Sequence, residues 1–202
     1  LAVIVAQPSF VVALLCATLG YAVMSLVMTA TPLAMKHYAH PFANTSFVIQ
    51  WHVLGMFAPS FFTGHLIRHL GVLKILVIGA ALEVTCVVIN LTGTNVTHFW
   101  SALFLLGVGW NFLFVGGTTL LTETYRPGER AKVQGINDFV VFGTVTVASL
   151  SAGALHSNLG WAAVNLGVLP LLTVVVASAL WLATRRTPPT TAGEALPGVD
   201  EG

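Results

Sequence analysis

The chain alternates long apolar stretches with short polar segments. Six stretches each hold roughly 20 mostly apolar residues, the length that a helix needs to cross a bilayer. They lie at 9–31, 46–68, 71–92, 97–122, 132–154 and 159–184. The third, "LKILVIGAALEVTCVVINL", shows none of the strict alternation of a membrane β-strand. The pattern predicts an all-α membrane protein in which residues 1–186 form a bundle of six transmembrane helices.

Prolines refine the ends of these helices. Pro8 suits the first turn of the first helix, and Pro32 predicts its end. The segment 32–45 is then the one long loop, and the others are short. Pro59 lies inside the second stretch and predicts a kink in its inner half.

Composition agrees with a membrane protein. Hydrophobic residues make up 56% of the 202 residues and charged residues only 7%, against about 25% charged in a soluble domain. The net charge of +1 offers no basic surface for nucleic acid. Cys16 and Cys86 are too few for a disulfide framework or a metal site, so no cofactor is expected. The segment 187–202, rich in Pro, Gly, Thr and acid, predicts a disordered cytoplasmic tail.

Lysine and arginine predict the orientation. With the N-terminus in the cytoplasm, seven of these residues fall on the cytoplasmic side and only Lys36 falls outside. The seven are Arg68, Lys74, Arg126, Arg130, Lys132, Arg185 and Arg186. Both ends of the chain are therefore predicted to be cytoplasmic.

The fourth stretch holds the strongest candidates for solute binding. In "GVGWNFLFVGG", Trp110 and Asn111 lie near the middle of the helix among glycines. Asn111 could bind a solute through hydrogen bonds while Trp110 and Phe114 provide an apolar wall. The alternative is an asparagine satisfied across a tightly packed helix pair.

The first two stretches supply further candidates. Tyr21 and Met28 share one helical face that could line a substrate cavity, although simple packing is the alternative. Gln50 and His52 lie in the outer third of the second stretch. We expect Gln50 to line the cavity. His52 titrates near neutrality and could carry a proton, or it could sit beside an interfacial tryptophan belt.

Two acidic residues need an explanation. Glu83 is a carboxylate well inside the third stretch, where it must be neutral or paired. It could couple transport to protons, or it could be a neutral Glu held by a backbone carbonyl. Asp138 lies just inside the fifth stretch, where capping or an ion pair with Arg130 or Lys132 is more natural than substrate binding.

The charged turn "GHLIRHLGVLK", residues 64–74, resembles the loop signature of the major facilitator superfamily. Gly64, Gly71 and Lys74 match that signature, which lies between the second and third helices of each six-helix half. Arg68 stands where the family has an acid, and His69 where it has a base. Such decay is usual in the second copy, in the C-terminal half.

A second element supports the resemblance, which extends over nearly the whole chain. Glu123 followed by Arg130 is similar to the family's acid-to-arginine element at the inner end of the fourth helix of a half. The resemblance implies that this pair joins the loop signature and Asp138 in a cytoplasmic charge network. It also implies that the first and fourth helices line the cavity, which favours Tyr21, Trp110 and Asn111 as site residues over Glu83.

The resemblance implies a secondary active transporter for a small solute, working by alternating access and coupled to protons. The chain would be the C-terminal half of a twelve-helix bundle, and its beginning at Leu1 suits a missing N-terminal half. It would be a multi-pass protein of the plasma (inner) membrane, in contact with lipid. No motif predicts an enzyme. The alternatives are a self-contained six-helix channel subunit or intramembrane enzyme, and a non-transporting receptor with a transporter fold.

Overall fold

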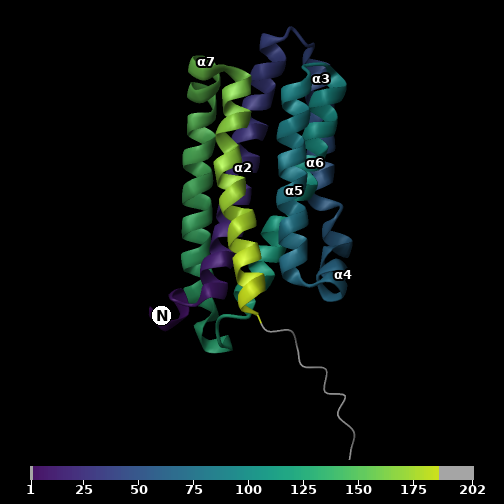
Figure 1. Cartoon of the computed structure of the whole chain (residues 1–202). Helices are drawn as coiled ribbons and strands as arrows, with labels where there is room; N and C mark the ends of the chain where they lie inside the picture. Colours follow the sequence, from purple (N-terminus) through teal and green to yellow (C-terminus); the bar gives the residue numbers. More distant parts are fainter. Residues whose placement is uncertain (1, 187–202) are drawn as a thin grey trace, which may run out of the picture.

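The computed structural model describes residues 2–186, and these are helical apart from short connections, with no strand among them. The tail predicted at 187–202 lies outside the described residues. In order, the elements are α1 (Ala2–Val5), α2 (Pro8–His37), α3 (Phe42–Phe57), α4 (Ser60–Leu70), α5 (Val72–Thr92), α6 (Val96–Thr122), the 3₁₀ turn η1 (Pro127–Glu129) and α7 (Arg130–Arg185). Figure 1 shows them as an upright bundle.

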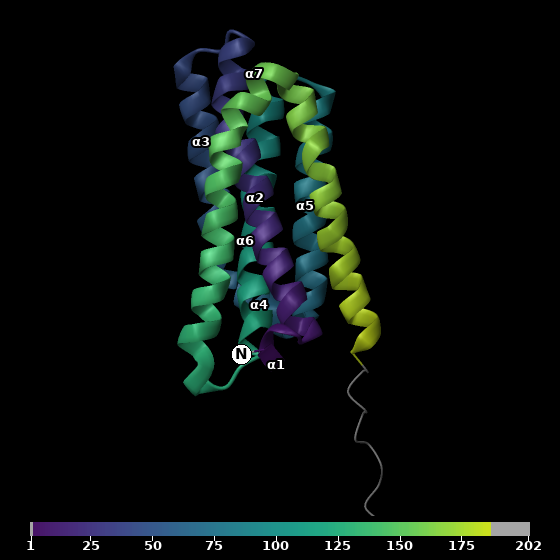
Figure 2. The same cartoon turned by 90° about the vertical axis from the view of Figure 1, so that its left-hand side faces the viewer.

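The last helix, α7, is two antiparallel legs joined at Gly160. The backbone of Gly160 has φ 81° and ψ 174°, values that L-residues with a side chain rarely adopt. The chain therefore reverses there, and Figure 2 shows the two legs meeting at the top of the bundle with α2 visible between them. The first leg covers the fifth predicted stretch and the second leg covers the sixth.

The second predicted stretch is interrupted at Ala58 and Pro59. Proline has no N–H to donate, so α3 ends at Phe57 and α4 begins at Ser60. Gly71, with φ 87°, then ends α4 and starts α5 within a single residue. This turn places Arg68 and Lys74 at the lower end of the bundle in Figure 1.

The expected end of the first helix at Pro32 is wrong. Helix α2 continues through Pro32 to His37, so the connection before α3 is only 38–41. A proline removes one backbone donor, and a long helix held by its neighbours tolerates that loss. The hydroxyl of Thr31 donates to the carbonyl of Val27 at 2.8 Å in the same turn.

Within residues 2–186, four helical stretches are long and apolar enough to cross a membrane: Pro8–His37, Val72–Thr92, Val96–Thr122 and Pro127–Arg185, the last being the folded-back α7 with η1. Helix α6 packs on α5, α3 and α2, and α7 packs on α2 and α5. Two apolar clusters fill the interior. One, around Met24, Phe99 and Trp161, lies in the upper half, and the other, around Phe10 and Leu113, lies in the lower half.

The lower end of the bundle holds the start of α2 and the end of α7 together. The guanidinium of Arg186 donates to Ser9 at 3.3 Å and to Glu123 at 2.7 Å. Gln7 donates to the carbonyl of Thr124 at 3.2 Å. The ends of α2, α6 and α7 therefore meet here, and this end of the bundle also carries every lysine and arginine other than Lys36 among the described residues.

Candidate functional site

Five aromatic side chains from four helices meet near mid-height; we call them the aromatic cluster. They are Tyr21 of α2, Phe57 of α3, Trp110 and Phe114 of α6, and Phe142 of α7. Trp110 and Phe114 are one helical turn apart and stack with their ring planes 9° from parallel and their centroids 5.3 Å apart. The cluster therefore has a stacked aromatic pair at its centre, in which Trp110 is buried.

Tyr21 packs edge-on against the stacked rings of Trp110 and Phe114. Its ring centroid lies 5.1 Å from Trp110 and 5.6 Å from Phe114. The ring centroid of Phe142 lies 6.1 Å from that of Tyr21, and the ring centroid of Phe57 lies 6.3 Å from that of Trp110. Phe57 and Phe142 are 59% and 51% exposed, so the cluster is open at both edges.

Trp110 has an unused hydrogen-bond donor. Its indole Nε1 is buried and has no partner among the described residues. Burying an amide-like N–H without a partner costs about 1–3 kcal/mol. An acceptor on a bound solute would remove that penalty, so the cluster combines a stacking surface with one directional polar contact.

A group of hydroxyls lies one to two turns above the cluster, where α2 faces the first leg of α7. Ser25 and Thr29 of α2 lie 3.4 and 3.2 Å from the hydroxyl of Ser149. Ser25 follows Tyr21 by one turn, and Ser149 follows Phe142 by two turns. Hydroxyls can both donate and accept, so this group can bind a polar chain extending from the aromatic cluster.

Asn111 is satisfied within the protein. Its amide donates to the carbonyl of Met56 at 2.8 Å and to Ser60 at 2.7 Å. Its oxygen accepts from Thr63 at 2.7 Å. These bonds bridge the interruption between α3 and α4, so the geometry fits the alternative of an asparagine satisfied across a helix pair. Its role in solute binding stays a prediction.

Met28 packs half-buried against the upper apolar cluster, whereas Gln50 is exposed on α3 and has no hydrogen-bond partner among the described residues. The structure brings Tyr21, Trp110 and Phe114 together and leaves Gln50 apart from them. Phe57, Phe142 and Ser149 are additions that the sequence analysis missed. The signal for Phe142 was an aromatic residue beside glycine in the fifth apolar stretch.

Two buried titratable side chains flank α6. His52 is fully buried, its Nδ1 lies 2.7 Å from the carbonyl of Leu103, and its Nε2 has no partner among the described residues. Glu83 is also fully buried, and neither carboxylate oxygen has a partner there. A methyl group added to Gly109 would lie 2.8 Å from the Glu83 Cγ, so this glycine leaves the space that Glu83 fills.

The charge network differs from the predicted one. Glu123 forms its ion pair with Arg186, at 2.7 Å, and no ion pair joins it to Arg130 in residues 2–186. Arg68 lies 3.0 Å from the ring of His65 on its own helix. Asp138 is exposed and accepts from its neighbour Asn137 at 3.1 Å, and it pairs with neither Arg130 nor Lys132 in that range.

A bundle of helices long and apolar enough to cross a bilayer defines an integral membrane protein. The sequence profile of the Major Facilitator Superfamily matches residues 13–199. The chain belongs to this family, which confirms the resemblance that its loop signature indicated.

Three relatives fit this assignment. The chain is 46% identical to the riboflavin transporter RfnT of Brucella anthropi over 173 residues, which are 86% of this chain and 44% of that protein. It is 32% and 31% identical to two uncharacterized MFS-type transporters of Bacillus subtilis, YdeG and YddS. Those alignments cover 76% and 78% of this chain and 37% of each protein. The chain thus spans less than half the length of these relatives, and no solved structure matches it.

Proposed function

We propose that this chain forms half of a secondary transporter that moves a planar heteroaromatic solute of the flavin type across the membrane. The observation that carries the proposal is the aromatic cluster, in which Trp110 and Phe114 stack on each other and the buried indole N–H of Trp110 has no partner among the described residues. The relative named as a riboflavin transporter supports the choice of solute.

The site suits the two chemical parts of a flavin. A fused ring system with carbonyl oxygens can stack on aromatic side chains and accept from the Nε1 of Trp110. A polyhydroxylated side chain can exchange hydrogen bonds with the hydroxyls of Ser25, Thr29 and Ser149. In this proposal Tyr21 fixes the edge of the ring system.

A second six-helix half would complete the site. Phe61 and Phe139 continue the stripes of Phe57 and Phe142 by one helical turn, and they are 92% and 82% exposed. An exposed aromatic face of this kind is typical of an interface between proteins. Lipid on this face would leave the edges of the aromatic cluster uncovered, whereas a second half of the transporter would cover them. The proposed transporter has twelve helices and moves its solute by rocking of the two halves around this site.

Orientation follows from charge. The basic residues at the lower end of the bundle in Figure 1 support a cytoplasmic location for that end, with both ends of this chain inside and the protein in the plasma (inner) membrane. Lys36 and the turn at Gly160 then face outside.

Proton coupling is proposed through Glu83 and His52. Each is fully buried and keeps at least one titratable atom without a partner among the described residues. Both side chains contact α6, the helix that carries Trp110, since Glu83 packs on Gly109 and the Nδ1 of His52 lies 2.7 Å from the carbonyl of Leu103. A change in protonation on either side would therefore act on the helix that holds the solute.

The test is uptake of radiolabelled riboflavin into proteoliposomes that contain the full gene product. Trp110→Phe keeps the stacking ring and removes the N–H, so we expect affinity to fall by about tenfold, as for one lost hydrogen bond. Trp110→Ala removes both contacts, and we expect a larger loss of about a hundredfold. Quenching of flavin fluorescence measures binding independently of uptake.

Trp181→Ala is the matched control, because Trp181 is an exposed tryptophan on the second leg of α7, stacked only under Arg185. It should leave uptake unchanged. Equal losses in Trp110→Ala and Trp181→Ala would contradict the site. Flavin binding without uptake would indicate a receptor with a transporter fold instead of a transporter.

A further inference from the structure

A cavity lies away from the aromatic cluster, at the outer end of the bundle. Its volume is about 690 Å³, and it lies between the end of α2 and the top of α7. Its lining includes Lys36, His37, Tyr38, His156 and Trp161. We call it the outer pocket.

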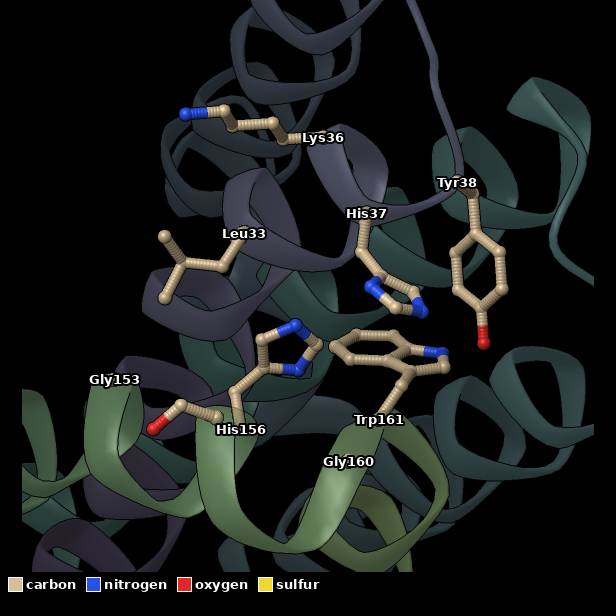
Figure 3. A pocket seen from close by; sticks show the side chains of 9 residues that line it. Leu33, Lys36, His37, Tyr38, Gly153, His156, Gly160 and Trp161 are labelled. Carbon is tan, nitrogen blue, oxygen red and sulfur yellow. The ribbon is translucent and has the colours of Figure 1, made fainter.

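Two imidazoles face each other in the outer pocket. The rings of His37 and His156 lie edge to face with centroids 6.3 Å apart, and Trp161 lies 6.5 Å from His156. Figure 3 shows these three rings side by side, whereas the amino group of Lys36 points away from them. The Nδ1 of His156 is buried and has no hydrogen-bond partner among the described residues.

The side chains of the outer pocket that can carry charge near neutral pH are all cationic when protonated. Lys36 and His37 come from α2, His156 comes from α7, and the only other titratable lining group is the phenol of Tyr38. No carboxylate lines the pocket. The four acidic residues that the structure describes lie elsewhere: Glu83 in the middle of α5, and Glu123, Glu129 and Asp138 near the opposite end.

His156 lies at the end of the first leg of α7, one helical turn before Gly160 and between the predicted spans 132–154 and 159–184. Its pKa is below the ordinary value, first because burial disfavours the charged ring and second because His37 repels a further positive charge. A negative group between the two rings would reverse the second effect and raise the pKa. Binding of an anion and uptake of a proton are therefore linked at this pair.

We propose that the outer pocket binds an oxyanion, a phosphate or a phosphate ester, between the imidazoles of His37 and His156. Two protonated imidazoles donate charge-assisted hydrogen bonds to such a group, and Lys36 adds positive charge at its edge. The site is separate from the aromatic cluster and does not depend on the solute proposed above. It would make the outer face sensitive to an anion in acidic medium.

The experiment is isothermal titration of the purified full-length protein with inorganic phosphate at about pH 5 and about pH 8, on either side of the ordinary histidine pKa. We expect affinity to be at least about tenfold higher at the lower pH, corresponding to about one proton taken up with the anion. Titration in two buffers of different ionisation enthalpy measures that proton directly.

Variants separate the contributions. His37→Gln and His156→Gln should each abolish the pH dependence, whereas Lys36→Gln should weaken binding similarly at both pH values. His98→Gln is the matched control, because His98 is at the same end, also has an Nδ1 without a partner among the described residues, and does not line the outer pocket. Thermal unfolding of each variant verifies that it is folded.

The probe also identifies the source of the oxyanion. Displacement of phosphate by flavin mononucleotide but not by riboflavin indicates a phosphate ester, and displacement by neither indicates a free oxyanion; both support the site. Displacement by riboflavin would overturn it, because the ring would then be recognised instead of the charge. No phosphate binding at either pH, affinity independent of pH, or an equal loss in His98→Gln would also overturn it.

Discussion

The hydroxyl of Thr63 donates a hydrogen bond to the side-chain oxygen of Asn111 at 2.7 Å, joining α4 to α6. The amide of Asn111 also reaches the carbonyl of Met56, which lies just before the break at Pro59. One side chain of α6 thus forms hydrogen bonds to both α3 and α4. Asn111 stabilises the arrangement of these two helices at the interruption.

Asn111→Ala should lower stability because it removes the hydrogen bonds to Met56 and Ser60, whereas the hydroxyl of Thr63 keeps the carbonyl of Pro59 as an acceptor. We expect a loss of about 1–2 kcal/mol, in the range of hydrogen bonds between membrane helices. Thermal unfolding in detergent measures it. Asn158→Ala is the control, since Asn158 is exposed and bonds only within its own helix. Equal unfolding temperatures in both variants would contradict the supporting role.

Gly109→Ala should also destabilise the bundle. Its new methyl carbon would lie 2.8 Å from both the Glu83 Cγ and the carbonyl oxygen of Gly79, so α5 and α6 must separate. Overpacking of this kind costs about 1–3 kcal/mol. The comparison is Gly167→Ala on the second leg of α7, where a methyl meets nothing within 4 Å. Measured by the same unfolding assay, Gly167→Ala should be neutral or slightly stabilising, and a loss as large as that of Gly109→Ala would argue against close packing as the cause.

The ion pair of Glu123 predicts a specific rescue. Glu123→Arg places two positive groups together with Arg186 and should slow solute uptake. Adding Arg186→Glu should restore part of the rate, because it re-forms the pair with its charges exchanged. Adding Arg130→Glu in its place should restore nothing. Recovery with Arg130→Glu alone would indicate that the partner changes during transport.

Glu83→Gln tests proton coupling without changing the volume of the side chain. The neutral amide should preserve folding, because the carboxylate has no ion-pair partner among the described residues. We expect accumulation driven by a pH gradient to be lost while exchange of labelled for unlabelled solute continues. Uptake that still follows the pH gradient would remove Glu83 from the coupling mechanism and leave His52 as the candidate.

Orientation can be measured by cysteine labelling of intact cells. Lys36→Cys should react with an impermeant maleimide from outside, whereas Gly128→Cys in η1 should react only after permeabilisation. The native Cys16 and Cys86 are fully buried, so background labelling should be low. Reversed labelling would mean that the charge bias does not set the topology.

Hydropathy was enough to predict that the described residues are helical, because a bilayer requires long apolar helices whatever their packing partners. The predicted end of α2 at Pro32 was wrong because it considered only the local effect of proline. Packing against neighbouring helices stabilises α2 beyond Pro32, as far as His37. The distribution of lysine and arginine near the helix ends likewise placed Arg68 and Lys74 at the same end of the bundle. It did not predict which acidic residue pairs with which basic residue.

The candidate site was only half accessible from the sequence. Tyr21, Trp110 and Phe114 were predicted, since an aromatic face within an apolar helix is visible in one dimension. Phe57 and Phe142 join them through contacts between helices that no spacing rule encodes. The partner of Glu123 was missed for the same reason: Arg186 is 63 residues away and reaches it only through the fold.

The bonds of Arg186 also bear on biosynthesis. Ser9 precedes Arg186 by 177 residues, and every long helix of the chain is made between them. Arg186 is synthesised after every helix that the structure describes, so Ser9 and Glu123 lack this partner until then. A nascent chain stopped before Arg186 would therefore lack the contacts that join the start of α2 to the end of α7.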